Sequence, residues 1–144
     1  MIDAVGPGPI ALDAAVFIYY VEEHPQYIAA VDPLFDEAIA GGRVLVTSAV
    51  TLLEVLVVPI RAGDVALAQR YGALLTRGRN LHLVDADRVQ LRTAAELRAR
   101  HGVRTPDALQ LAAALTTGCA AFVTNDGRLR DLPGLRVLQL RDFR

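Results

Sequence analysis

Short runs of apolar residues alternate along the chain with longer segments in which apolar and polar positions are mixed. The apolar runs have the length of buried strands, and they lie at 10–12, 44–46, 81–84, 121–123 and 137–140. Strands that alternate with helices are joined by crossover connections, which place them in a parallel sheet covered by helices on both faces. The pattern therefore predicts an α/β fold with a central, mostly parallel sheet of about five strands.

Residues that start or stop helices mark six helical segments between these runs. The first directly follows Asp13. We expect the second to begin at Asp32-Pro33 and to end before Gly41-Gly42, because Asp is a good N-cap and Pro fits the first helical position. The other four are expected over 48–58, 64–76, 87–101 and 105–115, with Ser48, Asp64, Asp85 or Asp87, and Thr105 as their starts.

Length and composition fit one α/β domain over residues 1–144. A chain of this length that is 53% hydrophobic, with a mean hydropathy of +0.32, has enough apolar residues for one buried core. The longest uncharged run, 108–125, includes Gln110, Thr116, Thr117 and Gly118 and is not typical of a membrane span. No signal peptide is visible, because nothing before Arg43 is basic and GPGP interrupts residues 6–9. The single cysteine, Cys119, excludes a disulfide framework and a cysteine zinc site, so a cytoplasmic protein is expected.

The charges are unevenly distributed, although the net charge is only −1. Residues 1–60 hold one Arg and eight acids, whereas residues 61–144 hold fourteen Arg and eight acids. There is no lysine, which is typical of a protein from a GC-rich genome. Alternatively, part of the arginine set forms one surface that faces the phosphates of a nucleic acid. The arginines of this hypothetical surface are 70, 77, 79, 88, 92, 98, 100 and 104.

Four acids stand at positions where a parallel sheet forms its sites. Asp13 and Asp126 directly follow predicted strands, Asp107 lies in the first turn of a predicted helix, and Glu54 interrupts the apolar run TLLEVLVV. Each has an ordinary structural explanation as well. Asp107 is a common helix-start residue, Asp126 is a common turn residue before Gly, and Glu54 has Arg61 as a possible partner.

Taken together, the four acids indicate a metal site. Carboxylates crowded at one edge repel one another and raise one another's pKa unless a cation binds between them. Oxygen ligands favour Mg²⁺ or Mn²⁺ over zinc, and the three histidines have no ligand spacing, so we assign them no role. A divalent cation at such a site activates water and stabilises the attacking and leaving oxygens in phosphodiester hydrolysis.

Each of the four acids lies in a short segment that can be compared with the motifs of known families. They are LDAAVFIYY with Asp13, TSAVTLLEVLVVPIRAGD with Glu54, TPDALQLAAAL with Asp107, and FVTNDGRL with Asp126. In this order the four segments resemble PIN-domain proteins, and specifically the VapC-type toxins of bacterial toxin–antitoxin pairs. The resemblance covers nearly the whole chain and implies a small Rossmann-like α/β/α domain that cleaves RNA with Mg²⁺ or Mn²⁺.

The resemblance also implies roles for individual residues. Asp13 and Asp107 would be direct metal ligands. Glu54 and Asp126 would complete the site, as ligands directly or through water or by orienting the attacking water, and Thr124 would support the ligands. Proteins of this kind commonly form homodimers and are inhibited by a cognate antitoxin whose tail enters the site.

One departure from the family pattern supports an alternative. Many relatives continue after the first Asp with Thr or Ser and then Asn, whereas Ala14 and Ala15 stand here. The loss of polar residues that orient metal ligands weakens metal affinity by about 10–100-fold. The acids are all present, so we expect an active enzyme. The alternative is a non-catalytic or weakly metal-binding module that acts through protein contacts.

Two other nuclease and phosphoryl-transfer classes fit less well. Receiver domains and aspartate-nucleophile phosphatases also place acids after the first strand, but they need a lysine, and the phosphatases need a second Asp where Ala15 stands. A structure-specific DNA nuclease uses similar chemistry, but this short chain resembles the toxin-type domains and has no added DNA-clamping helices.

Overall fold

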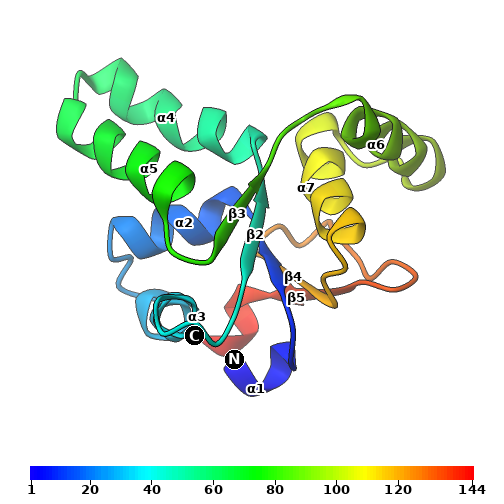
Figure 1. The fold of residues 1–144 in the computed structure, drawn as a ribbon, viewed down its shortest axis with the longest axis horizontal. Helices are drawn as coiled ribbons and strands as arrows, with labels where there is room; N and C mark the ends of the chain where they lie inside the picture. The colour runs from blue at the N-terminus through cyan, green and yellow to red at the C-terminus, as the bar shows by residue number, and fades with distance from the viewer.

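A five-stranded parallel sheet forms the centre of the computed structural model, which describes all 144 residues (Figure 1). Its order is β3-β2-β1-β4-β5, and every pair of neighbours is parallel. The strands are β1 (Ile10–Leu12), β2 (Leu45–Ser48), β3 (Leu81–Val84), β4 (Ala121–Thr124) and β5 (Arg136–Gln139). This confirms the predicted Rossmann-like α/β/α fold with a sheet of about five strands.

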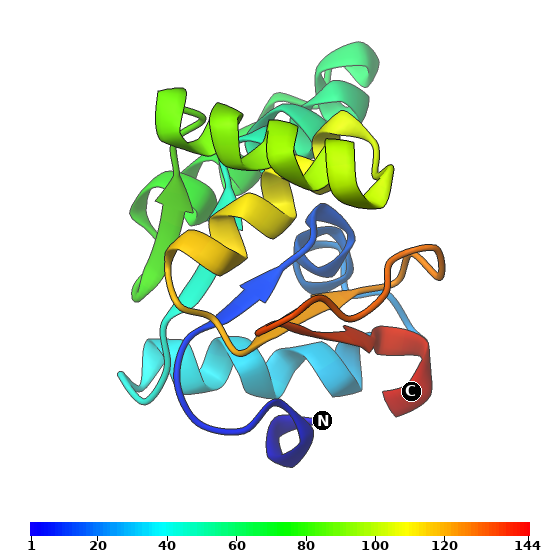
Figure 2. The same cartoon turned by 90° about the vertical axis from the view of Figure 1, so that its right-hand side faces the viewer.

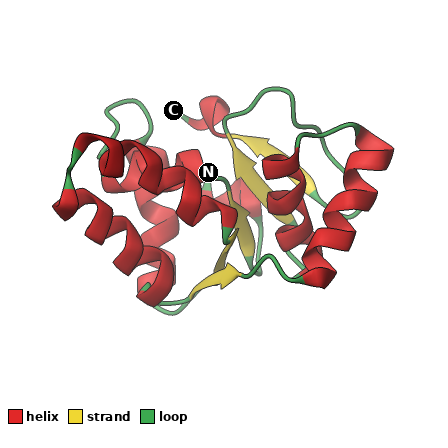
Figure 3. Cartoon of the chain, turned by 90° about the horizontal axis from the view of Figure 1, so that it is seen from above, coloured by secondary structure: helices red, strands yellow, loops and turns green.

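Helices cover both faces of the sheet. The helices are α1 (Ile2–Val5), α2 (Ala14–Val21), α3 (Ile28–Ile39), α4 (Val50–Ala62), α5 (Val65–Arg77), α6 (Arg88–His101) and α7 (Thr105–Thr116), and a 3₁₀ turn follows at Leu140–Phe143. One face carries α2 to α5, and the other carries α7 with α6 lying across it (Figures 2 and 3). The fold therefore has three layers.

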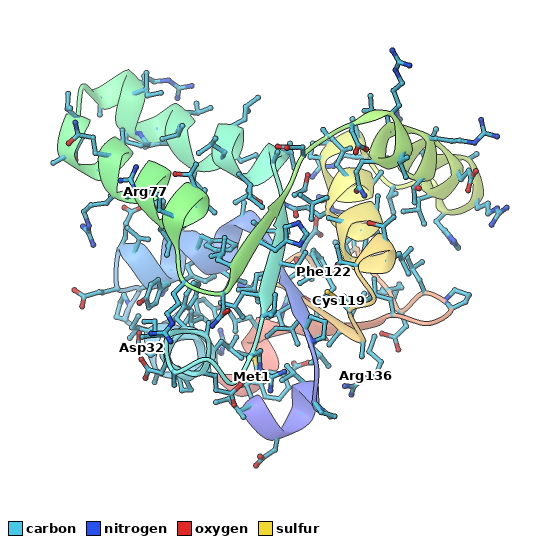
Figure 4. All side chains as sticks on the ribbon, in the orientation of Figure 1. Met1, Asp32, Arg77, Cys119, Phe122 and Arg136 are labelled. Atoms are coloured by element: carbon cyan, nitrogen blue, oxygen red, sulfur yellow. The ribbon has the colours of Figure 1, made fainter.

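The alternation of side chains along the strands divides the core into two clusters. In β1, Ile10 and Leu12 pack in the cluster beneath α2 to α5, and Ala11 between them packs in the cluster beneath α7. Phe122 of β4 belongs to the α7 cluster with Cys119, on the side of the sheet where Figure 4 labels both. Because both faces of β1 and β4 are buried, β1 is apolar throughout and β4 is apolar up to Thr124, so neither strand alternates with polar residues.

Two predicted helix caps are confirmed. The carboxylate of Asp64 accepts a hydrogen bond from the backbone N–H of Leu67, and that of Asp87 accepts one from Gln90. Thr105 is the first residue of α7 and Arg104 is its N-cap, so this boundary differs by one residue. Ser48 ends β2 instead of capping α4, although its hydroxyl accepts a hydrogen bond from the backbone N–H of Val50.

Two prolines that were expected at helix boundaries lie inside helices. Helix α3 begins at Ile28, with Pro33 in its interior, so the prediction of a start at Asp32-Pro33 is wrong. A proline there removes one helical hydrogen bond, but the helix buries five apolar side chains, which outweighs that loss. Similarly, α4 continues through Pro59 to Ala62 and ends at Gly63, which has a left-handed φ of 69°.

The arginines considered as one phosphate-facing surface are divided between the two sides of the molecule. Arg70 and Arg77 are on α5, and Figure 4 shows Arg77 on that side. Four others, Arg88, Arg92, Arg98 and Arg100, are on α6, which lies beyond the opposite face of the sheet. The eight arginines therefore do not all lie on one face of the sheet.

None of the helices has the combination of length and apolar character required to cross a membrane.

Candidate functional site

The four acids predicted from the sequence converge beyond the carboxyl ends of β1 and β4. The chain runs outward from β1 through β2 to β3 and then returns to β4 on the other side of β1, so β1 and β4 flank a topological switch point. Open α/β sheets bind their ligands at such points. Asp13 directly follows β1, and Asp126 lies two residues after β4.

Asp13 is held in one orientation by both of its oxygens. Its Oδ1 accepts a 2.8 Å hydrogen bond from the backbone N–H of Ala14, which makes Asp13 the N-cap of α2. Its Oδ2 accepts a 2.6 Å hydrogen bond from the Thr124 hydroxyl, and that hydroxyl also accepts one from the backbone N–H of Asp126. Thr124 therefore connects the ends of β1 and β4 and fixes the Asp13 carboxylate.

The charges of the other acids act on Asp13 at this site. Burial raises the pKa of the Asp13 carboxyl, and the nearby charges of Asp107 and Asp126 raise it further, while the hydrogen bonds from Thr124 and Ala14 oppose the rise. Burial also raises the pKa of Glu54, together with the charges of Asp13 and Asp107. All four acids thus contribute to one region of negative potential.

A buried amide that the sequence analysis did not single out as a site residue joins the elements that carry Asp107 and Glu54. Gln110, one turn after Asp107 on α7, accepts a hydrogen bond from the backbone N–H of Ser48 and donates one of 2.5 Å to Thr51, three residues before Glu54. Thr47 completes this network through the Thr51 hydroxyl and the carbonyl of Leu12. The only signal in the sequence is a Gln within an otherwise apolar helix face.

Two arginines bind two of the acids. The sequence analysis named Arg104 only as part of a phosphate-facing surface and did not name Arg128. The guanidinium group of Arg128 forms a two-pronged pair with the Asp126 carboxylate, at 2.9 Å from Nε and 2.6 Å from Nη2. The Arg104 Nε lies 3.7 Å from Oδ2 of Asp107. Both arginine side chains are more than 60% exposed, whereas the two carboxylates are at most 19% exposed. The signals were an arginine two residues after Asp126 and another three residues before Asp107.

The pKa values of the two carboxyl groups shift in opposite directions, because Asp126 is bound more closely by arginine than Asp107 is. Hydrogen bonds from Arg128 lower the pKa of Asp126 to about 2. The pKa of Asp107 is raised, chiefly by burial and then by the charge of Asp126, although Arg104 and Arg128 oppose the rise. Glu54 forms no ion pair with Arg61, so the ordinary explanation of Glu54 as a partner of Arg61 does not hold.

The residues present fit a hard divalent cation in donor type and in charge. Carboxylate and hydroxyl oxygens are the ligands that Mg²⁺ and Mn²⁺ prefer, and a cation would offset both the burial of the Asp13 charge and its repulsion by Asp107 and Asp126. No three acidic, histidine or cysteine side chains lie close enough together to form a ready metal-binding group. The carboxylates that Arg104 and Arg128 hold would have to turn toward a common point.

The structure also shows what Ala14 and Ala15 do in place of the polar residues that many relatives have after the first Asp. The Ala14 side chain is 4% exposed and packs in the apolar core, so Ala14 presents only its backbone N–H to Asp13. Ala15 is half-buried and offers no polar group to the site. Thr124 and the N-terminus of α2 are therefore the groups that orient Asp13 in this chain.

Comparison with known proteins identifies the class to which this fold and site belong. The family model of the PIN domain matches residues 10–135. This match covers most of the chain, and the chain therefore belongs to the PIN-domain family. No curated protein matches it by sequence.

Within that class, the solved structures that share the fold include several VapBC proteins, one of which is described as a member of a family of toxin–antitoxin systems. VapBC2 from Rickettsia felis bound to a DNA fragment from its promoter contains a chain with a TM-score of 0.67 and 18% identity, covering 91% of this chain and 98% of that one. DNA-bound VapBC from Salmonella typhimurium gives 0.62 and 22%, covering 92% and 98%. VapBC-5 from Mycobacterium tuberculosis gives 0.58 and 23%, covering 92% and 99%. At these identities the likeness shows a common fold.

Proposed function

We propose that this protein is a divalent-metal-dependent endoribonuclease and the toxin of a toxin–antitoxin pair. The observation that carries the proposal is the convergence of Asp13, Glu54, Asp107 and Asp126 at the switch point of a PIN domain, where burial, and then the charges of neighbouring acids, raise the pKa values of Asp13, Glu54 and Asp107. Acids that repel one another in a folded protein are a marker of a functional site. The solved structures with the same fold support the toxin role.

Each acid has a role in this proposal. Asp13 and Asp107 hold Mg²⁺, for which Mn²⁺ substitutes, and Asp126 and Glu54 complete the metal site or orient the attacking water. Thr124 keeps the Asp13 carboxylate in place through its hydroxyl. The bound cation supplies charge neutralisation and water activation for phosphodiester hydrolysis. The network around Gln110 keeps α7 and α4 in register, so Asp107 and Glu54 stay on the same side of the site.

The test is cleavage of total bacterial RNA by the purified full-length protein with Mg²⁺, with Mn²⁺ and with EDTA. We expect discrete fragments with either metal and none with EDTA. The Asp107→Asn protein, purified in parallel, should give no fragments under any of the three conditions. Mapping the fragment ends would then define the target sequence.

Two outcomes would contradict the proposal in different ways. Equal cleavage by the wild type and Asp107→Asn would identify a contaminating nuclease. No cleavage by either protein, together with no effect of Mn²⁺ on the melting temperature, would favour the alternative of a non-catalytic module. The specific observation on the side of that alternative is that arginines already neutralise Asp107 and Asp126.

A protein partner is a further part of the proposal. Exposed apolar side chains gather on α4 and at the start of α5, namely Leu53, Val57, Val58, Ile60 and Val65. Apolar side chains that remain exposed together on a surface are typical of protein–protein contact. A cognate antitoxin and a second copy of the chain are the two partners we propose.

The homodimer can be tested by light scattering. We expect the purified protein to have twice the 15.5 kDa mass of the chain, and Val58→Glu to shift it to the monomer because a charge is then buried at the contact. Val89→Glu on α6 is the matched control, since Val89 is 64% exposed and Val58 is 66% exposed. A monomeric wild type, or equal masses for the two variants, would contradict a dimer through this surface.

A further inference from the structure

We propose that Arg104 and Arg128 act as exchangeable counterions: they hold Asp107 and Asp126 in the metal-free protein, and they bind a phosphate group of the substrate once a divalent cation takes those carboxylates. The inference rests on the proposed function and adds two positioning residues to the four acids. It also gives the order of events at the site, because metal binding frees the groups that then hold the RNA.

The contacts support the first half of the exchange. Arg128 engages both oxygens of Asp126, so a cation that ligates this carboxylate competes with the guanidinium group for its charge and lone pairs. Arg104 shields Asp107 in a longer pair of 3.7 Å. The two pairs are also electrostatically coupled, because the positive charge of each arginine lowers the pKa of both carboxyl groups.

The exposure of the arginines makes the exchange easy. Their side chains are 66% and 61% exposed, so each is tethered only by its carboxylate and is free to move into solvent. The backbone N–H of Arg128 donates separately to Asp126, so the turn survives when the side chain moves away. Exposed ion pairs are weak, and a divalent cation with several oxygen ligands competes well against them.

A small hollow lies where the freed guanidinium groups would meet a phosphate. It has a volume of about 140 Å³ and is lined by both arginines, Asp107, His101 and Leu129 among others. Arginine forms two parallel hydrogen bonds to phosphate as it does to carboxylate, so the same groups suit both partners. In the metal-free protein, the salt bridges leave the hollow close to neutral. With a cation on Asp107, the freed arginines make it a positively charged site beside the scissile bond.

A turn-stabilising role for Arg128 is the simpler explanation, and it makes a different prediction. If Arg128 only stabilised the Asp126-Gly127 turn, its removal would loosen Asp126 and weaken metal binding. The exchange predicts the opposite sign, because a cation would no longer have to displace the guanidinium group. The sign of the change in metal affinity therefore separates the two explanations.

The first measurement is the dissociation constant for Mn²⁺ without RNA, by titration calorimetry at physiological salt. We expect Arg128→Gln to bind Mn²⁺ about two- to five-fold more tightly than the wild type, and Arg104→Gln to change in the same direction by less. Arg130→Gln is the matched control. Arg130 is exposed in the same loop and donates only to the carbonyl of Gly127, so this variant measures the effect of losing one nearby positive charge.

The second measurement is the affinity for a labelled ten-nucleotide RNA in Ca²⁺, with a gel to check that the RNA stays intact. We expect Arg128→Gln and Arg104→Gln to bind RNA about ten-fold more weakly and to lower the salt slope by about one. Arg100→Gln on the exposed side of α6 should change RNA affinity less. Arg128→Lys should recover part of the RNA affinity, because lysine keeps the charge but not the two-pronged geometry.

The outcomes distinguish this inference from the proposed function. If the wild type binds Mn²⁺ and Asp107→Asn does not, but Arg128→Gln binds it no more tightly than Arg130→Gln, the counterion exchange is wrong and the metal site stands. Unchanged RNA affinity in both arginine variants would also overturn the exchange. If neither the wild type nor Arg128→Gln binds Mn²⁺, the proposed metal site and the exchange both fail. Binding by Arg128→Gln alone would support the exchange.

Discussion

Replacing Asp13 by Asn is expected to abolish RNA cleavage and, in the absence of metal, to stabilise the protein. Activity should fall by at least about 100-fold, since removal of a residue that only orients a metal ligand already costs about 10–100-fold in affinity or activity. The melting temperature in EDTA should rise by at least about 2 °C, because a buried charge that repels two neighbouring acids is removed. Asparagine is isosteric and still accepts the hydrogen bond from Ala14 through its carbonyl oxygen.

Thermal unfolding of the variant in EDTA measures the second effect separately from catalysis. Asp3→Asn is the matched control, since it makes the same charge change at an exposed residue of α1. A drop in the melting temperature of Asp13→Asn would mean that the hydrogen bond from Thr124 outweighs the repulsion among the acids. A loss of activity without any gain in metal-free stability would mean that Asp13 is catalytic without being electrostatically strained.

Adding Mn²⁺ is expected to raise the melting temperature of the wild type markedly and that of Asp107→Asn hardly at all. A ligand that binds only the folded state stabilises it by about 2.7 kcal/mol at one hundred times its dissociation constant. For a chain of this size that corresponds to roughly 5–10 °C. The physical reason is that a cation neutralises the mutual repulsion of Asp13, Asp107 and Asp126 while making new bonds to oxygen.

A Mn²⁺ titration followed by differential scanning calorimetry measures this shift, and its reversal by EDTA shows that the ion is responsible. Asp36→Asn, an exposed acid on α3, should keep the full shift. If Asp107→Asn kept it too, the ion would be bound elsewhere on the acidic surface. If the wild type showed no shift, the metal-dependent part of the proposed function would be wrong.

The fold could be predicted from the sequence where local signals and burial agree. Asp64 and Asp87 cap helices as expected, since an N-cap aspartate satisfies the free N–H groups of the first turn wherever the chain permits it. Helix α3 was misplaced because Pro33 is a strong local signal, and tertiary burial of one helix face overrode it. The boundary of a helix is decided by packing that a local pattern does not contain.

For the candidate site, the sequence pointed to the four acids but not to most of the residues that hold them. Asp13 and Asp126 were identifiable because carboxylates after strands of a parallel sheet must meet at one edge, whereas Glu54 and Asp107 were identified as an acid within an apolar run and an acid in the first turn of a helix. The hydrogen bond from Thr124 to Asp13 joins residues that are 111 positions apart, so only the family motif pointed to it. Arg128 was missed, and Arg104 was named only as one of eight candidate phosphate-facing arginines, because fourteen arginines are spread along the second half of the chain. Nothing in the spacing separates the two that face the site from those on the outside of α6.

The position of β1 in the middle of the sheet has a consequence for the folding kinetics. Its neighbour β2 follows early in the chain, its other neighbour β4 comes late, and the Asp13–Thr124 hydrogen bond joins residues that are 111 positions apart. Contacts between residues so distant in sequence form late and slowly. A nascent chain or an amino-terminal fragment that lacks β4 therefore has no assembled site. Recovery of activity on refolding should accompany the slowest phase, after most of the helices have formed.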